Sequence, residues 1–155
     1  MAQASIVPEM GGTPDQLRGD RALRWAAIFF AIGLAFHTAD HLRRGTGVLT
    51  PEVLWGGMVI TVTGVIAIVA VLARHRLASE VGVAVGFSTA VSVSASHLLP
   101  HWSAFSDAFP GGGVDGLSWA AVAVEIASAI ILGGAAVYAL RHRARNDPRW
   151  GSPRT

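Results

Sequence analysis

Residues 58–73 read MVITVTGVIAIVAVLA, and this stretch decides the fold class. It carries no charge and no polar stripe, whereas a helix on the surface of a soluble protein presents a polar face to water. It belongs to an apolar run from Val53 to Ala73, and similar runs extend over Trp25–Leu42, Val81–Leu99 and Leu117–Leu140. Each approaches or exceeds the roughly 20 residues that a membrane helix needs. The sequence therefore predicts four transmembrane helices.

The composition of the whole chain agrees with this prediction. Of its 155 residues, 52% are hydrophobic and 14% are charged, while about 25% are charged in an ordinary soluble domain. There is no cysteine, which excludes disulfides, thiolate metal sites and cysteine nucleophiles. The formal net charge of +2 is too small to indicate a nucleic-acid partner. We expect a multi-pass protein of the plasma membrane.

Arginine placement predicts how the spans are oriented. One end of the expected bundle carries Arg18, Arg21, Arg24, Arg74, Arg76, Arg141, Arg143, Arg145 and Arg149. The connection from His101 to Gly116, at the other end, has no arginine, and only Arg43 and Arg44 run against the trend. Cytoplasmic segments are enriched in basic residues. We therefore expect an all-α integral membrane protein, a four-transmembrane-helix up-down bundle with both termini in the cytoplasm.

The segments outside the spans divide the chain further. Residues 1–21, rich in glycine, proline and polar residues, are expected to be a disordered cytoplasmic tail. Residues 22–141 form the transmembrane domain, and 142–155 a cytoplasmic basic tail. Between the last two spans, Trp102, Phe105 and Phe109 recur at helical spacing. This pattern predicts a short amphipathic helix at the membrane interface, either resting there or covering a site as a lid.

Two histidine pairs stand at the ends of apolar runs. His37 and His41 have the spacing H-x-x-x-H, and His97 and His101 repeat it. On a helix this spacing puts both rings on one face. Ionisable side chains are costly in lipid and indicate function by default. In an up-down bundle the first and third spans are diagonal, so His37 and His97 should face each other across the core. Pro100 disfavours helix at the preceding residue, which leaves His101 on a turn.

Two carboxylates extend the pattern. Glu125 interrupts the fourth span with no charged neighbour, so it must be paired, ligated or protonated. Asp40, beside His41, is a candidate ligand or partner of an imidazole N–H. Nitrogen and oxygen donors without thiolates suit iron or zinc better than copper(I). The predicted metal ligands are His37, His41, His97, His101 and Glu125. Glu125 and Asp40 are the candidate general bases.

Three functions fit this constellation. The first is a membrane enzyme with a metal site near the extracytoplasmic leaflet, an oxidoreductase or a hydrolase acting on a lipid-like or membrane-soluble substrate. The second is a haem b electron carrier with His37 and His97 as axial ligands, where Gly33, Gly86 and Ala90 leave room for the ring. The third is a non-enzymatic accessory subunit or transporter. Membrane lipid is the expected surrounding partner, and a homo-oligomer or a larger membrane complex is compatible with each.

Overall fold

The computed structural model describes residues 14–45, 47 and 49–145, and this part of the chain is all-helical. Its helices are α1 (Pro14–Arg44), α2 (Pro51–Leu72), α3 (Ala78–His97) and α4 (Gly116–Arg145). All four are long and apolar enough to cross a membrane. The prediction of an all-helical multi-pass membrane protein is therefore confirmed at this level.

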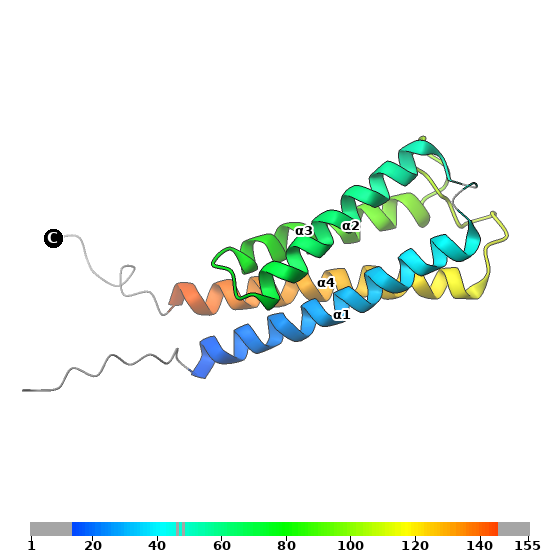
Figure 1. The fold of residues 1–155 in the computed structure, drawn as a ribbon. Helices are drawn as coiled ribbons and strands as arrows, with labels where there is room; N and C mark the ends of the chain where they lie inside the picture. The colour runs from blue at the N-terminus through cyan, green and yellow to red at the C-terminus, as the bar shows by residue number, and fades with distance from the viewer. Residues whose placement is uncertain (1–13, 46, 48, 146–155) are drawn as a thin grey trace, which may run out of the picture.

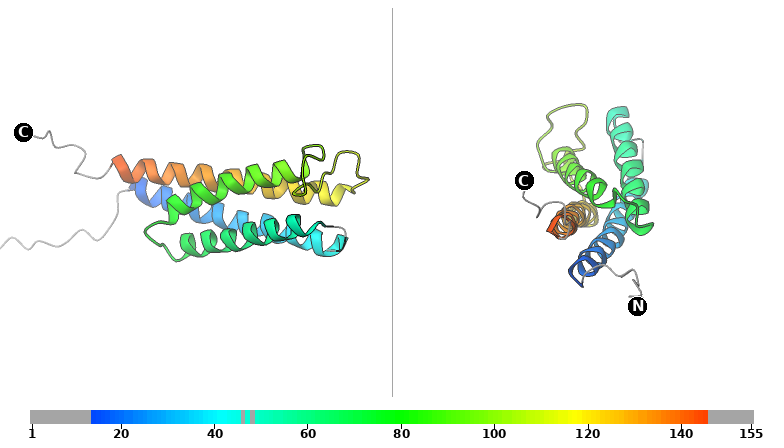
Figure 2. Two further views of the ribbon diagram at one scale, coloured as in Figure 1. Left: turned by 90° about the horizontal axis from the view of Figure 1, so that it is seen from above. Right: turned by 90° about the vertical axis from the view of Figure 1, so that its left-hand side faces the viewer.

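The helices form an elongated bundle. The start of α1, the turn between α2 and α3, and the end of α4 lie at one end, and the other two connections lie at the opposite end (Figures 1 and 2). Helix α4 packs extensively along both α1 and α3, whereas α2 has much smaller contacts with α1 and α3. The bundle thus consists of a close-packed α1–α4–α3 unit with α2 attached less tightly.

Small residues explain the close packing around α4. A Cβ on Gly86 would lie 2.6 Å from the Gly133 nitrogen, and one on Gly33 would lie 3.2 Å from the Glu125 Cα. Ala129 and Ala136 of α4 are fully buried. Without side-chain bulk the helix backbones approach closely, and van der Waals packing of this kind drives helix association in membranes.

Helix α2 is the most exposed of the four. Its buried residues are Gly64, Ala67 and Val71, and its exposed side chains are large and apolar, among them Val62 and Ile66. In water such a surface would be unfavourable because apolar area costs free energy to hydrate. Lipid removes this cost, so the helix fits a membrane.

The helix ends follow local chemistry. Thr50 caps α2 by accepting a hydrogen bond from the Val53 N–H at 3.2 Å, with Pro51 in the first turn. Helix α3 stops at His97, three residues before Pro100. The end of α3 before Pro100 agrees with the expectation from the sequence.

The tail boundaries differ from the prediction. Residues 14–21, assigned to a disordered tail, form the first two turns of α1. Proline at the first helical position and Asp15 in the first turn both favour a helix start. Helix α4 likewise continues into the tail assigned from residue 142, as far as Arg145. The remaining tail residues, 1–13 and 146–155, lie outside the described part of the chain.

The predicted amphipathic helix over residues 102–109 is wrong. This segment consists of turns, bends and irregular backbone without a helix. The N–H groups of Asp107 and Phe109 donate to the carbonyls of Ser96 and His97 at 3.0 Å each, so the connection folds back on the end of α3 instead of forming its own helix. Phe109, expected at the membrane interface, is only 2% exposed.

Candidate metal centre

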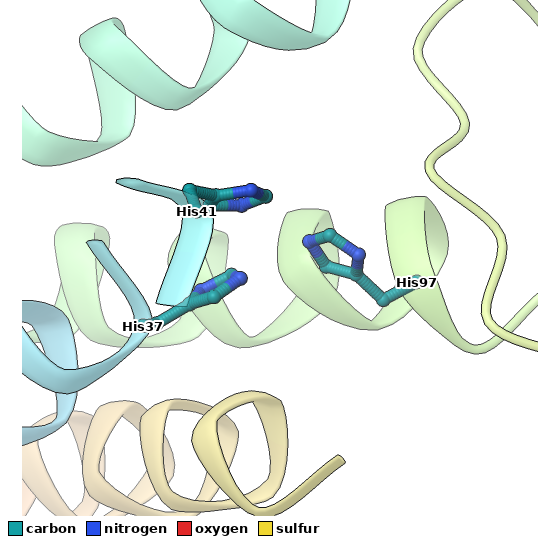
Figure 3. Close-up of side chains that lie close together, drawn as sticks. All are labelled: His37, His41 and His97. Atoms are coloured by element: carbon teal, nitrogen blue, oxygen red, sulfur yellow. The ribbon is translucent and has the colours of Figure 1, made fainter. Parts of the chain in front are cut away.

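Three of the four histidines expected at this end of the bundle converge. His37 and His41 project from neighbouring turns of α1, and His97 is the last residue of α3 (Figure 3). One ligand nitrogen from each lies within 4.8 Å of the other two. His37 and His97 are buried and His41 is half-buried. The expectation that His37 and His97 meet across the bundle agrees with this geometry.

Glu125 of α4 contacts one histidine of this cluster. Its carboxylate Oε2 contacts Nδ1 of His37, and the side chain is 1% exposed. Gly33 lies one turn before His37 and lets α4 come near enough for this contact. A carboxylate on one imidazole nitrogen fixes the tautomer and the ring, and it leaves the other nitrogen as the electron-pair donor. Glu125 is thus the partner of a histidine, on the far side of the ring from the other two imidazoles.

The nitrogens that face this cluster are uncommitted. Nε2 of His37 and Nδ1 of His41 are buried, and neither has a hydrogen-bond partner among the described residues. Nδ1 of His97 lies 3.1 Å from the backbone oxygen of Asp107, so it donates there and Nε2 keeps its lone pair. Buried polar atoms without partners are costly and rare. Binding a cation would compensate them.

The cluster fits a transition metal in donor type, and binding would draw its nitrogens closer together. Zinc binds imidazole nitrogen at about 2.0–2.1 Å in tetrahedral geometry, which puts two ligand nitrogens about 3.4 Å apart. The three nitrogens lie within 4.8 Å of one another, so side-chain rotations would bring them to this separation. Three histidines with further coordination positions open are the donor set of catalytic zinc sites.

Two predicted site residues stand apart from the cluster. His101 is exposed, lies beyond the end of α3 and does not belong to the three-nitrogen group. Asp40 is buried, but its Oδ1 accepts from Arg43 at 2.8 and 3.0 Å. Its second oxygen has no partner within residues 14–145 as described. The structure therefore unites His37, His41, His97 and Glu125.

Sequence reasoning missed the role of two arginines beside the cluster. Arg44 makes two hydrogen bonds to the carboxylate of Asp107, at 2.8 and 3.1 Å. Arg43 bridges Asp40 and Asp115, the latter at 2.9 Å. These ion pairs tie the end of α1 to the connection that covers His97. The signal was available, since acidic and basic residues gather at the same end of an otherwise apolar bundle.

The two arginines contribute to lowering the pKa of the loop carboxylates Asp107 and Asp115. Partial burial raises the pKa of Asp107, but the hydrogen bonds and charge of Arg44, with a further contribution from His97, outweigh it and hold the pKa below its usual value. The pKa of Asp115 is also lowered, first by the backbone N–H of Ser118 and then by Arg43. Both carboxylates are therefore ionised at neutral pH and pair with the arginines as charges.

An apolar groove of about 770 Å³ leads to the histidines. His37, His41, His97 and Glu125 are among its lining residues, and most of the others belong to α2 and α3. Gly57 of α2 adds no side chain to this lining, and a Cβ there would meet open space. The volume is in the range of pockets for small organic ligands. An apolar molecule in this groove would lie beside the three histidine rings.

The same geometry gives no support to haem ligation. The rings of His37 and His97 meet edge to face with centroids 4.9 Å apart, which leaves no layer for a porphyrin between them. The space beside Gly33 and Gly86, expected to admit the ring, is occupied by α4. These glycines serve helix packing.

Comparisons with known proteins add no family to this description. No protein-family model matches the chain, and neither the curated proteins nor the solved structures give a match. The function proposed below rests on the residues and geometry of this chain.

Proposed function

We propose that this protein is a plasma-membrane metalloenzyme in which His37, His41 and His97 bind one transition metal, iron or zinc. The observation that carries the proposal is the pair of buried, partnerless nitrogens on His37 and His41 that face His97. A bound metal of this kind activates water or oxygen. The substrate would be lipid-like or membrane-soluble, because the groove that reaches the cluster is apolar.

The proposed topology puts this chemistry near the extracytoplasmic leaflet. Both termini are cytoplasmic in an up-down bundle, as the arginine bias favours. Arg43 and Arg44 would then lie outside, against the rule. Their ion pairs with Asp40, Asp115 and Asp107 give these two arginines a structural role at that end.

The chain's own residues have distinct roles in the proposal. Glu125 accepts the Nδ1 proton of His37 and holds the ring with Nε2 toward the other histidines. Of the two candidate bases, Glu125 lines the groove and Asp40 does not. We therefore assign Glu125 the positioning of His37 and the exchange of protons with a bound substrate. Arg44 and Asp107 hold the connection against His97.

Metal content of purified protein tests the proposal. Elemental analysis of the full chain in detergent should find about one iron or zinc per chain. His37→Ala and His97→Ala should each lose it. His101→Ala is the matched control, because this histidine lies at the same end but outside the cluster, and it should keep the metal.

The outcomes separate the candidate functions. Iron would favour an oxidoreductase and zinc a hydrolase. Equal metal content in the wild type and in all three variants would contradict the site. If the wild-type protein takes up neither metal, the accessory or transport role remains. In that role the buried His37–Glu125 pair binds a substrate or relays protons.

A further inference from the structure

A second pocket, of about 220 Å³, lies at the end of the bundle opposite to the histidines. Figures 1 and 2 show that the start of α1, the α2–α3 turn and the end of α4 come together there. Four arginines line it: Arg21 and Arg24 of α1, Arg74 of the turn and Arg143 of α4. Arginines from three separate segments of the chain thus surround one concavity.

The positive charge of this pocket is poorly compensated. Asp20, the acidic residue in its lining, pairs with Arg143 at 3.0 Å. The side chains of Arg21, Arg24 and Arg74 make no ion pair or hydrogen bond with other described residues. Like charges held close together repel one another. An anion in the pocket would remove this repulsion.

The backbone at Arg74 is a second, independent observation. Arg74 has φ of +55°, the left-handed conformation that an arginine adopts only at some cost. Arg74 directly follows Ala73, the C-cap residue of α2. Glycine is the usual residue at the position after the C-cap. Glycine would form this turn more favourably, so an arginine there indicates that its side chain has a use.

We propose that this pocket binds the phosphate group of an anionic phospholipid. Guanidinium groups match phosphate oxygens in geometry and charge. Leu23 and Val71 contribute apolar surface to the same lining, which suits the part of a lipid next to its headgroup. The pocket is at the end of the apolar spans, where headgroups lie, and basic pockets between helices on this side of a membrane bind such groups. Free phosphate would make no use of the apolar wall.

The test compares two triple variants of the full chain in phosphatidylcholine nanodiscs that contain a minor fraction of phosphatidylglycerol. The pocket variant is Arg21→Gln, Arg24→Gln and Arg74→Gln, the three lining arginines without an ion pair among the described residues. The control removes three nearby arginines outside the lining: Arg18→Gln, Arg76→Gln and Arg141→Gln. Native mass spectrometry would measure the phosphatidylglycerol retained by each protein.

Diffuse attraction to an anionic surface is worth about fivefold per arginine near that surface, and both variants lose it equally. The pocket variant should bind phosphatidylglycerol at least about tenfold more weakly than the control, because it also loses the hydrogen bonds of its guanidinium groups to the phosphate. Equal losses in both variants would overturn the proposal in favour of diffuse attraction. Displacement of the lipid by millimolar inorganic phosphate would overturn the lipid as the ligand. Metal content would be unchanged throughout, so this result is independent of the histidine site.

Arg74→Gly separates binding from folding. Glycine favours the left-handed turn, so the melting temperature should stay the same or rise while phosphatidylglycerol binding falls about fivefold. Binding equal to that of the wild type would contradict a role for this side chain.

Discussion

His37 uses its two ring nitrogens in different ways, and the candidate site depends on this difference. Nδ1 meets the buried carboxylate of Glu125, and Nε2 faces His41 and His97 without a partner. A carboxylate in this position makes imidazole a better ligand and fixes its direction. The role of Glu125 can therefore be tested apart from its role in packing.

Glu125→Gln should weaken metal binding about 10- to 100-fold, the usual effect of losing such a partner. Glutamine has a similar shape and still forms hydrogen bonds, so the protein should fold. Competition with a chelator measures the affinity, and a melting curve of the same preparation measures stability. Glu52→Gln, at an exposed position at the start of α2, is the control. An unchanged affinity in Glu125→Gln would reduce Glu125 to a packing role.

The lowered pKa of Asp107 predicts how stability depends on pH. A carboxyl whose pKa is lower in the folded protein than in the unfolded chain stabilises the fold above its unfolded pKa, and this contribution is lost as the pH falls through the folded pKa. The wild type should therefore melt above Asp107→Asn at neutral pH, and the difference should shrink below about pH 4. Melting curves in detergent across this range would measure it. A difference that stays constant with pH would argue against the Arg44–Asp107 ion pair as its source.

At the scale of helices, the contact between α1 and α4 sets the position of the site. Gly33, close to the Glu125 backbone, stands where the two helices must approach for His37 and Glu125 to meet. A side chain at this position would push the two helices apart and would thereby separate His37 from Glu125. Packing and the metal site are thus coupled through one glycine.

Gly33→Ala should cost about 1–3 kcal/mol of stability, the usual penalty for overpacking, and should also lower the metal affinity. The control is Gly57→Ala on α2, where the added methyl group meets nothing within 4 Å. That change should keep metal binding and add about 0.5–1 kcal/mol through helix propensity. Thermal melting and metal titration of both variants would compare them. If both glycines tolerate alanine equally, the close approach at Gly33 is not needed.

The sequence predicts the helices better than it predicts the connections. Apolar runs and the spacing of His37, His41 and His97 are local patterns, and they identify the spans and most of the cluster. The path of residues 98–115 depends on hydrogen bonds to the end of α3, which no local pattern encodes. For the same reason Phe109 turns inward beside His97. The pairing of Asp40 with Arg43, three residues on in the same helix, is by contrast a local contact that the spacing of the two residues could have predicted.

At the scale of the whole molecule, the two ends of the bundle differ in charge pattern. The end with the histidines pairs its arginines with carboxylates, and the other end leaves several arginines uncompensated. The larger number of arginines at this other end favours one orientation in the membrane, because short cytoplasmic segments are enriched in basic residues.

At a fusion point after Thr155, only a reporter of the kind that functions in the cytoplasm should be active. A second reporter inserted after Gly112, in the α3–α4 connection, should be active only outside. Alkaline phosphatase and a fluorescent protein, which function on opposite sides, would serve as the pair. The reverse pattern would place the histidines at the cytoplasmic leaflet.

The loose attachment of α2 has a consequence for how such a protein can change. The three histidines and Glu125 belong to α1, α3 and α4, while α2 contributes wall to the groove. Substitutions along α2 can thus widen, narrow or block the route to the candidate metal site without moving any of these four side chains. The molecules that the groove admits can therefore change through substitutions in α2 alone. The chemistry of the site can change through substitutions in the other three helices.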